Sequence, residues 1–264
     1  MRILKESFSC QRDGLTIRGT QYRPADGHDL PAAIVCHGFM ANQGTVRRYA
    51  RFLAGKGYAA FCFDFCGGCV IGGRSDGATT DMSVLTEISD LEAVMDHVSG
   101  LPHVRSGRSL LMGCSQGGFV AALTAARHPG RVQQLILLYP ALCMPDDARA
   151  GKMMWARFDP ADVPERLSCG PMKLGRRYVT DVTGMHPPAE LTPYAGDVLI
   201  LHGGRDRIVA PAYSEEAMAA YRLARQERQG TNRLMHRQIP GAGHGFSGRA
   251  DRLALQHISD FLTP

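Results

Sequence analysis

Hydrophobic positions along the chain first alternate with polar ones and then change to a succession of short apolar runs and helical patterns. SFSCQ and LTIRGTQY alternate on either side of Arg12-Asp13-Gly14, which predicts a β-hairpin with a tight turn. Beyond the hairpin, short strand-like runs are each followed by a segment with helical spacing. The expected strands are 32–36, 58–65, 109–114, 132–140, 198–203 and 235–241, and the expected helices are 46–57, 82–100, from 116, from 212 and 249–262.

Regular alternation of strands and helices is typical of an α/β fold with a mostly parallel central sheet and helices on both faces. The hairpin would then lie antiparallel at one edge. Between Pro140 and Asp197 the alternation stops, and the segment is rich in Pro, Gly, Met and Arg. Because it is too long for an ordinary connection, residues 141–196 (below, the insertion) are predicted to form a lid. The core would comprise residues 1–140 and 197–264.

The composition is that of an ordinary folded protein and disfavours two classes of partner. The 264 residues are 44% hydrophobic and 21% charged, which allows one large domain or one domain with an insertion. The net charge is +5, but Lys and Arg form no stripe interleaved with aromatic residues, so we expect no nucleic-acid binding. No apolar run approaches the roughly 20 residues that span a bilayer, so we expect no membrane partner.

The cysteines and the N-terminus indicate a reducing compartment. The first residues, MRILKESFSCQRDG, lack the apolar core of a signal peptide, and several of the eight cysteines lie in apolar strand-like runs. We therefore expect a cytoplasmic protein with reduced thiols. Cys66-Gly67-Gly68-Cys69 is a C-x-x-C, but it lacks a thioredoxin-like context and a second pair of zinc ligands. We therefore predict that this segment is a glycine-rich loop near the rim of the active site described below, and we expect no metal and no cofactor.

The strongest chemical signal is Gly113-Cys114-Ser115-Gln116-Gly117, which fits G-x-S-x-G between a predicted strand and a predicted helix. This context is what a nucleophile elbow requires, since a strained turn lifts the serine hydroxyl above the sheet. The glycines allow the strand and the helix to approach closely. Ser115 is therefore the candidate nucleophile.

A serine hydroxyl needs a base, and the base needs an acid that holds its tautomer. His244 lies in the glycine-rich loop Gly241–Phe246 after the last predicted strand, which makes it the candidate base. Asp206 follows the strand that ends in LHGG and completes the order Ser, Asp, His along the chain. Asp197 precedes that strand and would lie at the wrong end of the sheet.

Two backbone N–H groups should stabilise the oxyanion of the tetrahedral intermediate. One is expected from Gln116, directly after the nucleophile. The other is expected from Phe39, in the loop His37-Gly38-Phe39 that follows the first parallel strand. His37 is expected to order this loop rather than to react.

With these pieces in order, nearly the whole chain resembles the α/β-hydrolase superfamily, and within it the bacterial cinnamoyl and feruloyl esterases. The resemblance rests on motifs spread along the chain: HGF at 37–39, FDF at 63–65, SDG at 75–77, MSVLTEISDLEAV at 82–94, GCSQGG at 113–118, FDPADVPERL at 158–167 and HGGRD at 202–206. It implies a serine carboxylic ester hydrolase acting on aromatic (cinnamoyl- or feruloyl-type) or short-to-medium acyl esters.

The resemblance also implies substrate-binding residues in the insertion. The lids of these esterases carry an aspartate and a tyrosine near the phenolic end of the substrate, and these align with Asp147 and Tyr178. Where such lids can place a glutamine, this chain has Met153-Met154-Trp155. We expect all three side chains, that of Trp155 included, to form an apolar wall of the substrate pocket. The segment between Phe65 and Ser75 is also longer than the usual glycine loop.

The motifs leave alternatives open. A serine peptidase or amidase of the same fold would use the same three residues, whereas a haloalkane dehalogenase needs a carboxylate nucleophile and a dienelactone hydrolase uses cysteine. A non-catalytic binding protein of this fold is the remaining alternative, although every expected catalytic piece is present. The expected partner is a small-molecule ester, and the sequence leaves a homodimer open.

Overall fold

The computed structural model describes residues 1–263, and its centre is an eight-stranded sheet in the order β1-β2-β4-β3-β5-β6-β11-β12. The strands are β1 (Ile3–Arg12), β2 (Leu15–Pro24), β3 (Ala32–Cys36), β4 (Ala59–Phe63), β5 (Ser109–Cys114), β6 (Val132–Leu138), β11 (Asp197–Gly203) and β12 (Leu234–Ile239). Every neighbouring pair from β4 to β12 is parallel. The expected α/β-hydrolase fold, with its mostly parallel sheet, is confirmed.

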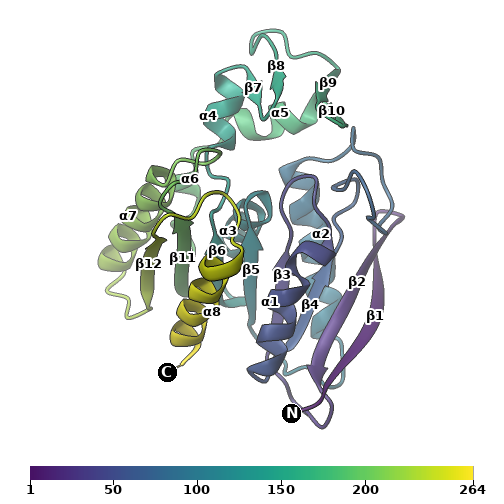
Figure 1. Ribbon diagram of the computed structural model, residues 1–264, viewed down its shortest axis with the longest axis vertical. Coiled ribbons are helices and arrows are strands. Elements are labelled where there is room, and N and C mark those ends of the chain that lie inside the picture. The colour runs from purple at the N-terminus through teal and green to yellow at the C-terminus, as the bar shows by residue number, and fades with distance from the viewer. Residues whose placement is uncertain (264) are drawn as a thin grey trace.

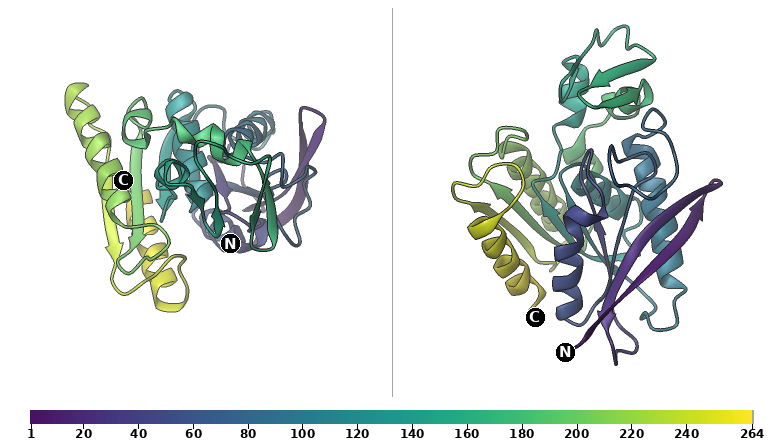
Figure 2. Two further views of the ribbon diagram at one scale, coloured as in Figure 1. Left: turned by 90° about the horizontal axis from the view of Figure 1, so that it is seen from above. Right: turned by 45° about the vertical axis from the view of Figure 1, so that its right-hand side comes forward.

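The hairpin β1–β2 forms one edge of the sheet, as predicted, and extends beside the core in Figure 2. Its two-residue turn places Asp13 at φ 50° and Gly14 at φ 81°, the left-handed conformation that a type I′ turn demands at both positions. The strands pair antiparallel from Arg12 opposite Leu15 to Ile3 opposite Pro24, and β2 then pairs antiparallel with β4.

Helices cover both faces of the sheet because successive side chains of the central strands point to opposite sides. On β3, for example, Ile34 belongs to one hydrophobic cluster and Val35 to the other. The helices α1 (Gln43–Gly55) and α8 (Gly248–Leu262) pack on one face and lie in front of the sheet in Figure 1. The helices α2 (Val84–Ser99), α3 (Gln116–Arg127) and α7 (Ala212–Glu227) pack on the other.

The bounds of several predicted elements are wrong by a few residues. The helix predicted over 46–57 begins at Gln43, because the side chain of Asn42 accepts a hydrogen bond from the N–H of Gly44 and caps the helix there. It ends at Gly55 rather than at Gly57. The strand predicted over 58–65 is limited to 59–63.

The insertion lies over the carboxyl ends of the parallel strands and forms the upper part of the molecule in Figure 1. It contains α4 (Met144–Arg149), β7 (Lys152–Met153), β8 (Ala156–Arg157), β9 (Arg166–Cys169), β10 (Met172–Gly175), α5 (Arg177–Thr183) and α6 (Pro187–Glu190). Its apolar side chains, such as Leu174 and Val179, join the same cluster as α2 and α3. Ser83, the N-cap of α2, also donates to Asp181 on α5 at 2.6 Å.

The eight cysteines are free thiols, and most of them are buried. Cys69 lies opposite Met40 in an isolated bridge, so the glycine-rich loop after Cys66 does border the loop that contains Phe39. Within residues 1–263, no group of three or more His, Cys, Asp or Glu side chains is placed to hold a metal ion. In the same residues, no helix combines the length and the apolar character needed to cross a membrane.

Candidate active site

Ser115 sits on a strained turn between β5 and α3. Its backbone has φ 53° and ψ −122°, a conformation that costs a non-glycine residue roughly 1–3 kcal/mol and is often found where function requires it. The turn is kept tight by two close approaches. A Cβ on Gly113 would lie 2.1 Å from the carbonyl oxygen of Gly117, and a Cβ on Gly117 would lie 2.2 Å from that of His37. These positions therefore require glycine, as the motif indicates.

Three loops at the carboxyl ends of β5, β11 and β12 bring Ser115, Asp206 and His244 together. The Ser115 hydroxyl lies 2.9 Å from Nε2 of His244, and Nδ1 of His244 lies 2.8 Å from Oδ2 of Asp206. Because a carboxylate only accepts, Nδ1 carries the imidazole proton and Nε2 is free to accept from the serine. The ring of Tyr139 packs edge-on against that of His244, 4.8 Å between centroids.

Asp206 is held as an anion by more than the histidine of the predicted triad. Its Oδ1 accepts from the N–H groups of Ile208 and Val209 at 2.9 and 3.0 Å. Its Oδ2 accepts from His244 and also from Nε2 of the fully buried His202 at 3.1 Å. Burial opposes ionisation, but the hydrogen bonds from His202, His244 and Val209 outweigh it and lower the pKa of Asp206 well below its ordinary range.

His202 is a residue of this network that the sequence reasoning missed. Its Nε2 faces two acceptors, Asp206 and the carbonyl oxygen of Val209 at 3.0 Å, so Nε2 carries a proton. Its Nδ1 lies 2.7 Å from the hydroxyl of Ser214 on α7. His202 thus fixes the orientation of the Asp206 carboxylate. Its place four residues before the acid, at the end of a buried strand, was the available signal.

The two predicted oxyanion donors border the same cavity as the nucleophile. Phe39 follows β3 and Gln116 is the first residue of α3, and both line the cavity that contains Ser115. Neither N–H has a hydrogen-bond acceptor within residues 1–263. A free N–H is what such a donor requires before substrate arrives. His37 holds this loop: its Nε2 accepts from the N–H of Phe65 at 3.1 Å, which agrees with the expected ordering role.

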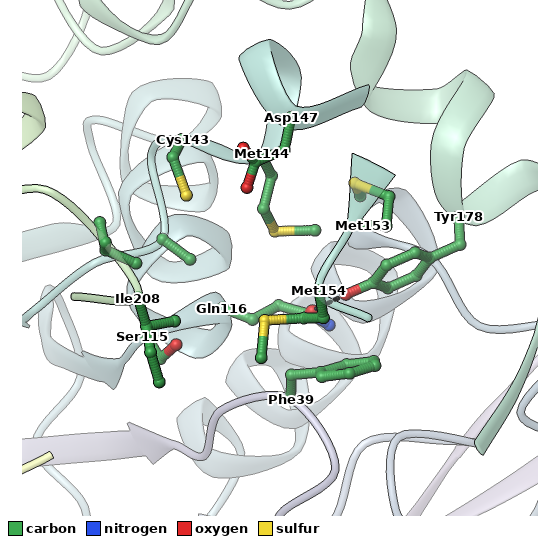
Figure 3. A pocket seen from close by; sticks show the side chains of 12 residues that line it. Phe39, Ser115, Gln116, Cys143, Met144, Asp147, Met153, Met154, Tyr178 and Ile208 are labelled. Carbon is green, nitrogen blue, oxygen red and sulfur yellow. Dashed lines mark hydrogen bonds between the residues drawn. The ribbon is translucent and has the colours of Figure 1, made fainter. Parts of the chain in front are cut away.

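A cavity beside Ser115 extends under the insertion, as Figure 3 shows. It holds about 410 Å³ of empty space, part of it open to solvent. Its walls are mainly apolar and rich in sulfur; they are Phe39, Ser115, Gln116, Ala141, Cys143, Met144, Asp147, Met153, Met154, Tyr178, Ile208 and Val209. Flexible thioether side chains give a wall that can adapt to the shape of an apolar group.

Asp147 and Tyr178 both line this cavity, and Figure 3 shows Asp147 at the end away from Ser115. Asp147 forms an ion pair with Lys152 at 3.0 Å and is partly exposed. Tyr178 is fully buried, and its hydroxyl donates to Oε1 of Gln116 at 2.5 Å. Having given away its proton, the Tyr178 oxygen can still accept a hydrogen bond from a bound molecule.

Trp155 does not lie in the cavity, so the prediction that it forms part of the apolar wall is wrong. Met154 and Trp155 form the two-residue turn between β7 and β8, and Met154 has a φ of 53°. Met154 contributes to the cavity wall, whereas the Trp155 ring lies over Gly170 and is 60% exposed. Met153, by contrast, is buried and lines the cavity as expected.

The fold and these residues together define a hydrolase of the α/β-hydrolase superfamily. Residues 30–181, more than half of the chain, match the family described as "Serine aminopeptidase, S33", and the chain belongs to that family. Human monoglyceride lipase is 31% identical over 157 residues, which make up 58% of this chain and 48% of that protein. The match therefore spans about half the length of this curated relative.

Solved structures agree on the fold over almost the whole length. Est1E from Butyrivibrio proteoclasticus, in a structure with ferulic acid bound, superposes with a TM-score of 0.84 at 24% identity and covers 97% of this chain and 100% of its own. DcsB, in complex with its substrate analogue, gives a TM-score of 0.72 at 22% identity and covers 98% of both chains. At these identities the likeness shows the fold alone.

Proposed function

We propose that this protein is a carboxylic ester hydrolase that works through an acyl-enzyme on Ser115. The observation that carries the proposal is the continuous hydrogen-bond chain Ser115–His244–Asp206 at the mouth of an apolar cavity. A serine hydroxyl whose proton can pass to a neutral histidine is an activated nucleophile, and the adjoining cavity can hold the acyl group.

The reaction follows from these positions. Ser115 Oγ attacks the ester carbonyl carbon as its proton passes to Nε2 of His244, and the oxyanion accepts from the N–H groups of Phe39 and Gln116. The tetrahedral intermediate collapses, the bond to the leaving oxygen breaks, and the imidazolium protonates the departing alcohol. Water then attacks the acyl-enzyme as its proton passes to His244, the acyl bond to Ser115 Oγ breaks, and the imidazolium returns its proton to Oγ as the carboxylic acid leaves.

The cavity favours esters over peptides. An aminopeptidase must hold the α-ammonium group next to the scissile carbonyl, and a carboxylate near the nucleophile is the usual means of doing so. Among residues 1–263, Asp147 is the one acidic residue that lines this cavity, and it lies at the end away from Ser115 and is paired with Lys152. This position of Asp147 supports an esterase over the peptidase activity in the family description.

The test is a comparison of kcat/KM for an ester and its matching amide with the same acyl group, such as an ethyl ester and a p-nitroanilide of phenylpropionic acid. We expect the ester to be cleaved at least ~100-fold faster. The Ser115→Ala variant, assayed in parallel, removes any contribution from contaminating hydrolases. Faster cleavage of the amide, or of amino-acid anilides with a free amine, would contradict the esterase proposal and indicate a peptidase.

Within ester hydrolysis, we propose that the insertion acts as a lid that selects a compact, preferably phenolic, aromatic acyl group. Three methionines, Met144, Met153 and Met154, suit an aromatic ring, and the carboxylate of Asp147 and the hydroxyl oxygen of Tyr178 can both accept from a phenol. The bound ferulic acid of Est1E supports this acyl class. The resemblance to monoglyceride lipase supports fatty acyl esters as the alternative.

If the lid reads the phenol, ethyl ferulate should be preferred over ethyl cinnamate, and Asp147→Ala and Tyr178→Phe should each shrink that preference by ~1–3 kcal/mol. The ratio of kcat/KM values for the two esters isolates this contact, because any general loss of activity cancels. Trp155→Ala is the matched control, since Trp155 lies outside the cavity and should leave the ratio unchanged. Equal losses on both esters would remove phenol recognition and leave a general carboxylesterase.

A further inference from the structure

A buried carboxyl group that takes no part in the steps above lies next to the oxyanion donor. Glu87, on α2, is 1% exposed, and its Oε2 accepts from Nε2 of Gln116 at 2.8 Å. On the other side of the same amide, the Tyr178 hydroxyl donates to Oε1. Both polar atoms of the Gln116 side chain are thus bonded, one to the core helix α2 and the other to α5 of the insertion.

These two bonds hold the side chain of Gln116, whose backbone N–H is the proposed oxyanion donor. Gln116 is the first residue of α3, so its N–H has no partner within the helix and is free for an oxyanion. The side chain, by contrast, is 1% exposed and locked at both of its polar atoms. A side chain fixed at its far end limits rotation of the peptide that carries the N–H, and small errors in donor placement reduce catalysis strongly.

We propose that Glu87 and Tyr178 are positioning residues that hold Gln116 from two sides, so that its backbone N–H stays aimed at the oxyanion formed on Ser115. This inference rests on the proposed function, because it assigns a role within that reaction. It also links the docking of the insertion to the oxyanion site. Tyr178 on α5 connects to α2 through Gln116, and Asp181 on α5 accepts directly from Ser83, the N-cap of α2.

Glu87 serves as this anchor in its uncharged form. Burial raises the pKa of Glu87 from 4.5 to about 8, the bond from Gln116 lowers it by less, and the nearby Asp90 raises it further. At neutral pH the group is therefore mostly a carboxylic acid. Above pH about 8 it ionises, and a buried negative charge beside the oxyanion site opposes the charge that develops in the transition state.

The thiols and the phenol around Glu87 do not titrate in that range. Burial raises the pKa of Cys36 on β3 and of Tyr178 on α5 well above their ordinary values, and it raises the pKa of Cys66 in the adjoining loop to about 12. Burial raises the pKa of Asp90, although its ion pair with Arg12 of β1, at 2.7 Å, opposes that shift; Asp90 is unchanged in the variants of residue 87. An alkaline change in activity that depends on residue 87 therefore reports on Glu87 itself.

Two substitutions of similar size test the proposal. Glu87→Gln keeps an oxygen that accepts from Gln116 and never ionises, whereas Glu87→Met offers only a thioether sulfur, which is a weak acceptor. At pH 7 we expect Glu87→Met to lower kcat roughly tenfold or more with KM changed less than about twofold, and Glu87→Gln to keep at least about a third of the wild-type kcat. Rates are expressed per active site titrated with a fluorophosphonate, so that unfolded protein does not count.

The pH profile gives a second readout, which a role in packing alone would not move. Wild-type kcat should fall as the pH rises through about 8, and this fall should be absent from Glu87→Gln. The same ionisation makes the stability of the wild type depend on pH. Because the pKa of Glu87 is higher in the folded than in the unfolded protein, the wild type loses stability as the pH rises from 4.5 to about 8. The Tm of Glu87→Gln should therefore rise relative to that of the wild type across that interval.

Equal kcat values for Glu87→Met and Glu87→Gln, or an alkaline fall that persists in Glu87→Gln, would overturn the inference. If Glu87→Met does not fold, the pH profile of Glu87→Gln decides alone. Failure of the proposed function has a different signature: Ser115 takes no fluorophosphonate label, or the wild type cleaves amides and not esters. Labelled, ester-cleaving variants that behave like the wild type reject the role of Glu87 only.

Discussion

Ser115→Ala and His244→Ala are each expected to lower kcat for ester hydrolysis by roughly 10⁴-fold or more while the fold is retained. Ser115 Oγ is the atom placed to attack, and Nε2 of His244, 2.9 Å away, is placed to take its proton. Because the two act as one unit, the Ser115→Ala, His244→Ala double variant should be little worse than either single variant.

A serine and a histidine that follow His244 in the chain provide control substitutions for this prediction. Ser247, the N-cap position of α8, makes no side-chain capping bond, and His257 lies in the second half of α8. Ser247→Ala and His257→Ala should keep at least about half of the wild-type kcat. Circular dichroism and Tm establish that all five variants, the double variant included, are folded. If either Ser115→Ala or His244→Ala kept a tenth of the wild-type rate, its catalytic assignment would be wrong.

Most of the fold could be predicted because its elements are delimited by local signals. The strand over 109–114 and the start of α7 at Ala212 were predicted to the residue, since apolar runs change there to helical spacing or to turns. The start of α1 was missed because Gln43, Gly44 and Thr45 carry no apolar periodicity. The Asn42 cap, rather than burial, sets that boundary.

The residues of the predicted triad and the predicted oxyanion donors could be brought together from sequence because each lies in the turn or loop that follows the carboxyl end of a parallel strand. Strand ends in a parallel sheet meet at one edge, so sequence order and element type fix which side chains converge. The prediction that Ser115, Asp206 and His244 act together rests on this convergence, and the structure joins their side chains by hydrogen bonds.

The remaining residues depend on contacts that no local pattern encodes. Trp155 was misplaced because the direction of a side chain in a two-residue turn is set by packing against Gly170, on a different hairpin. Glu87 occupies a core-facing position of α2 beside Val84, Ile88 and Leu91, which was a signal for a buried carboxyl. Its partner Gln116 lies 29 positions away, however, and only the fold brings the two together.

The four donors around Asp206 determine how an asparagine would sit in its place. The N–H groups of Ile208 and Val209 are part of the backbone and can only donate to Oδ1. An asparagine must therefore turn its carbonyl oxygen toward them and its NH₂ group toward His244 and His202. There it would meet two ring nitrogens that now carry protons, unless each imidazole moves its proton to the other nitrogen.

Asp206→Asn is accordingly expected to lower kcat by about 10³- to 10⁴-fold, less than Ser115→Ala, because His244 is driven to the tautomer with its proton on Nε2. In that tautomer His244 cannot accept the proton of Ser115, although a minor population keeps the productive form. The measurement is kcat for one ester in wild type, Asp206→Asn and Ser115→Ala, side by side. The ¹⁵N-coupled imidazole proton signals of His244 should show the proton transferred from Nδ1 to Nε2. Asp197→Asn, at the opposite end of β11, is the control and should remain active. An unchanged rate in Asp206→Asn would mean that another residue supplies the acid.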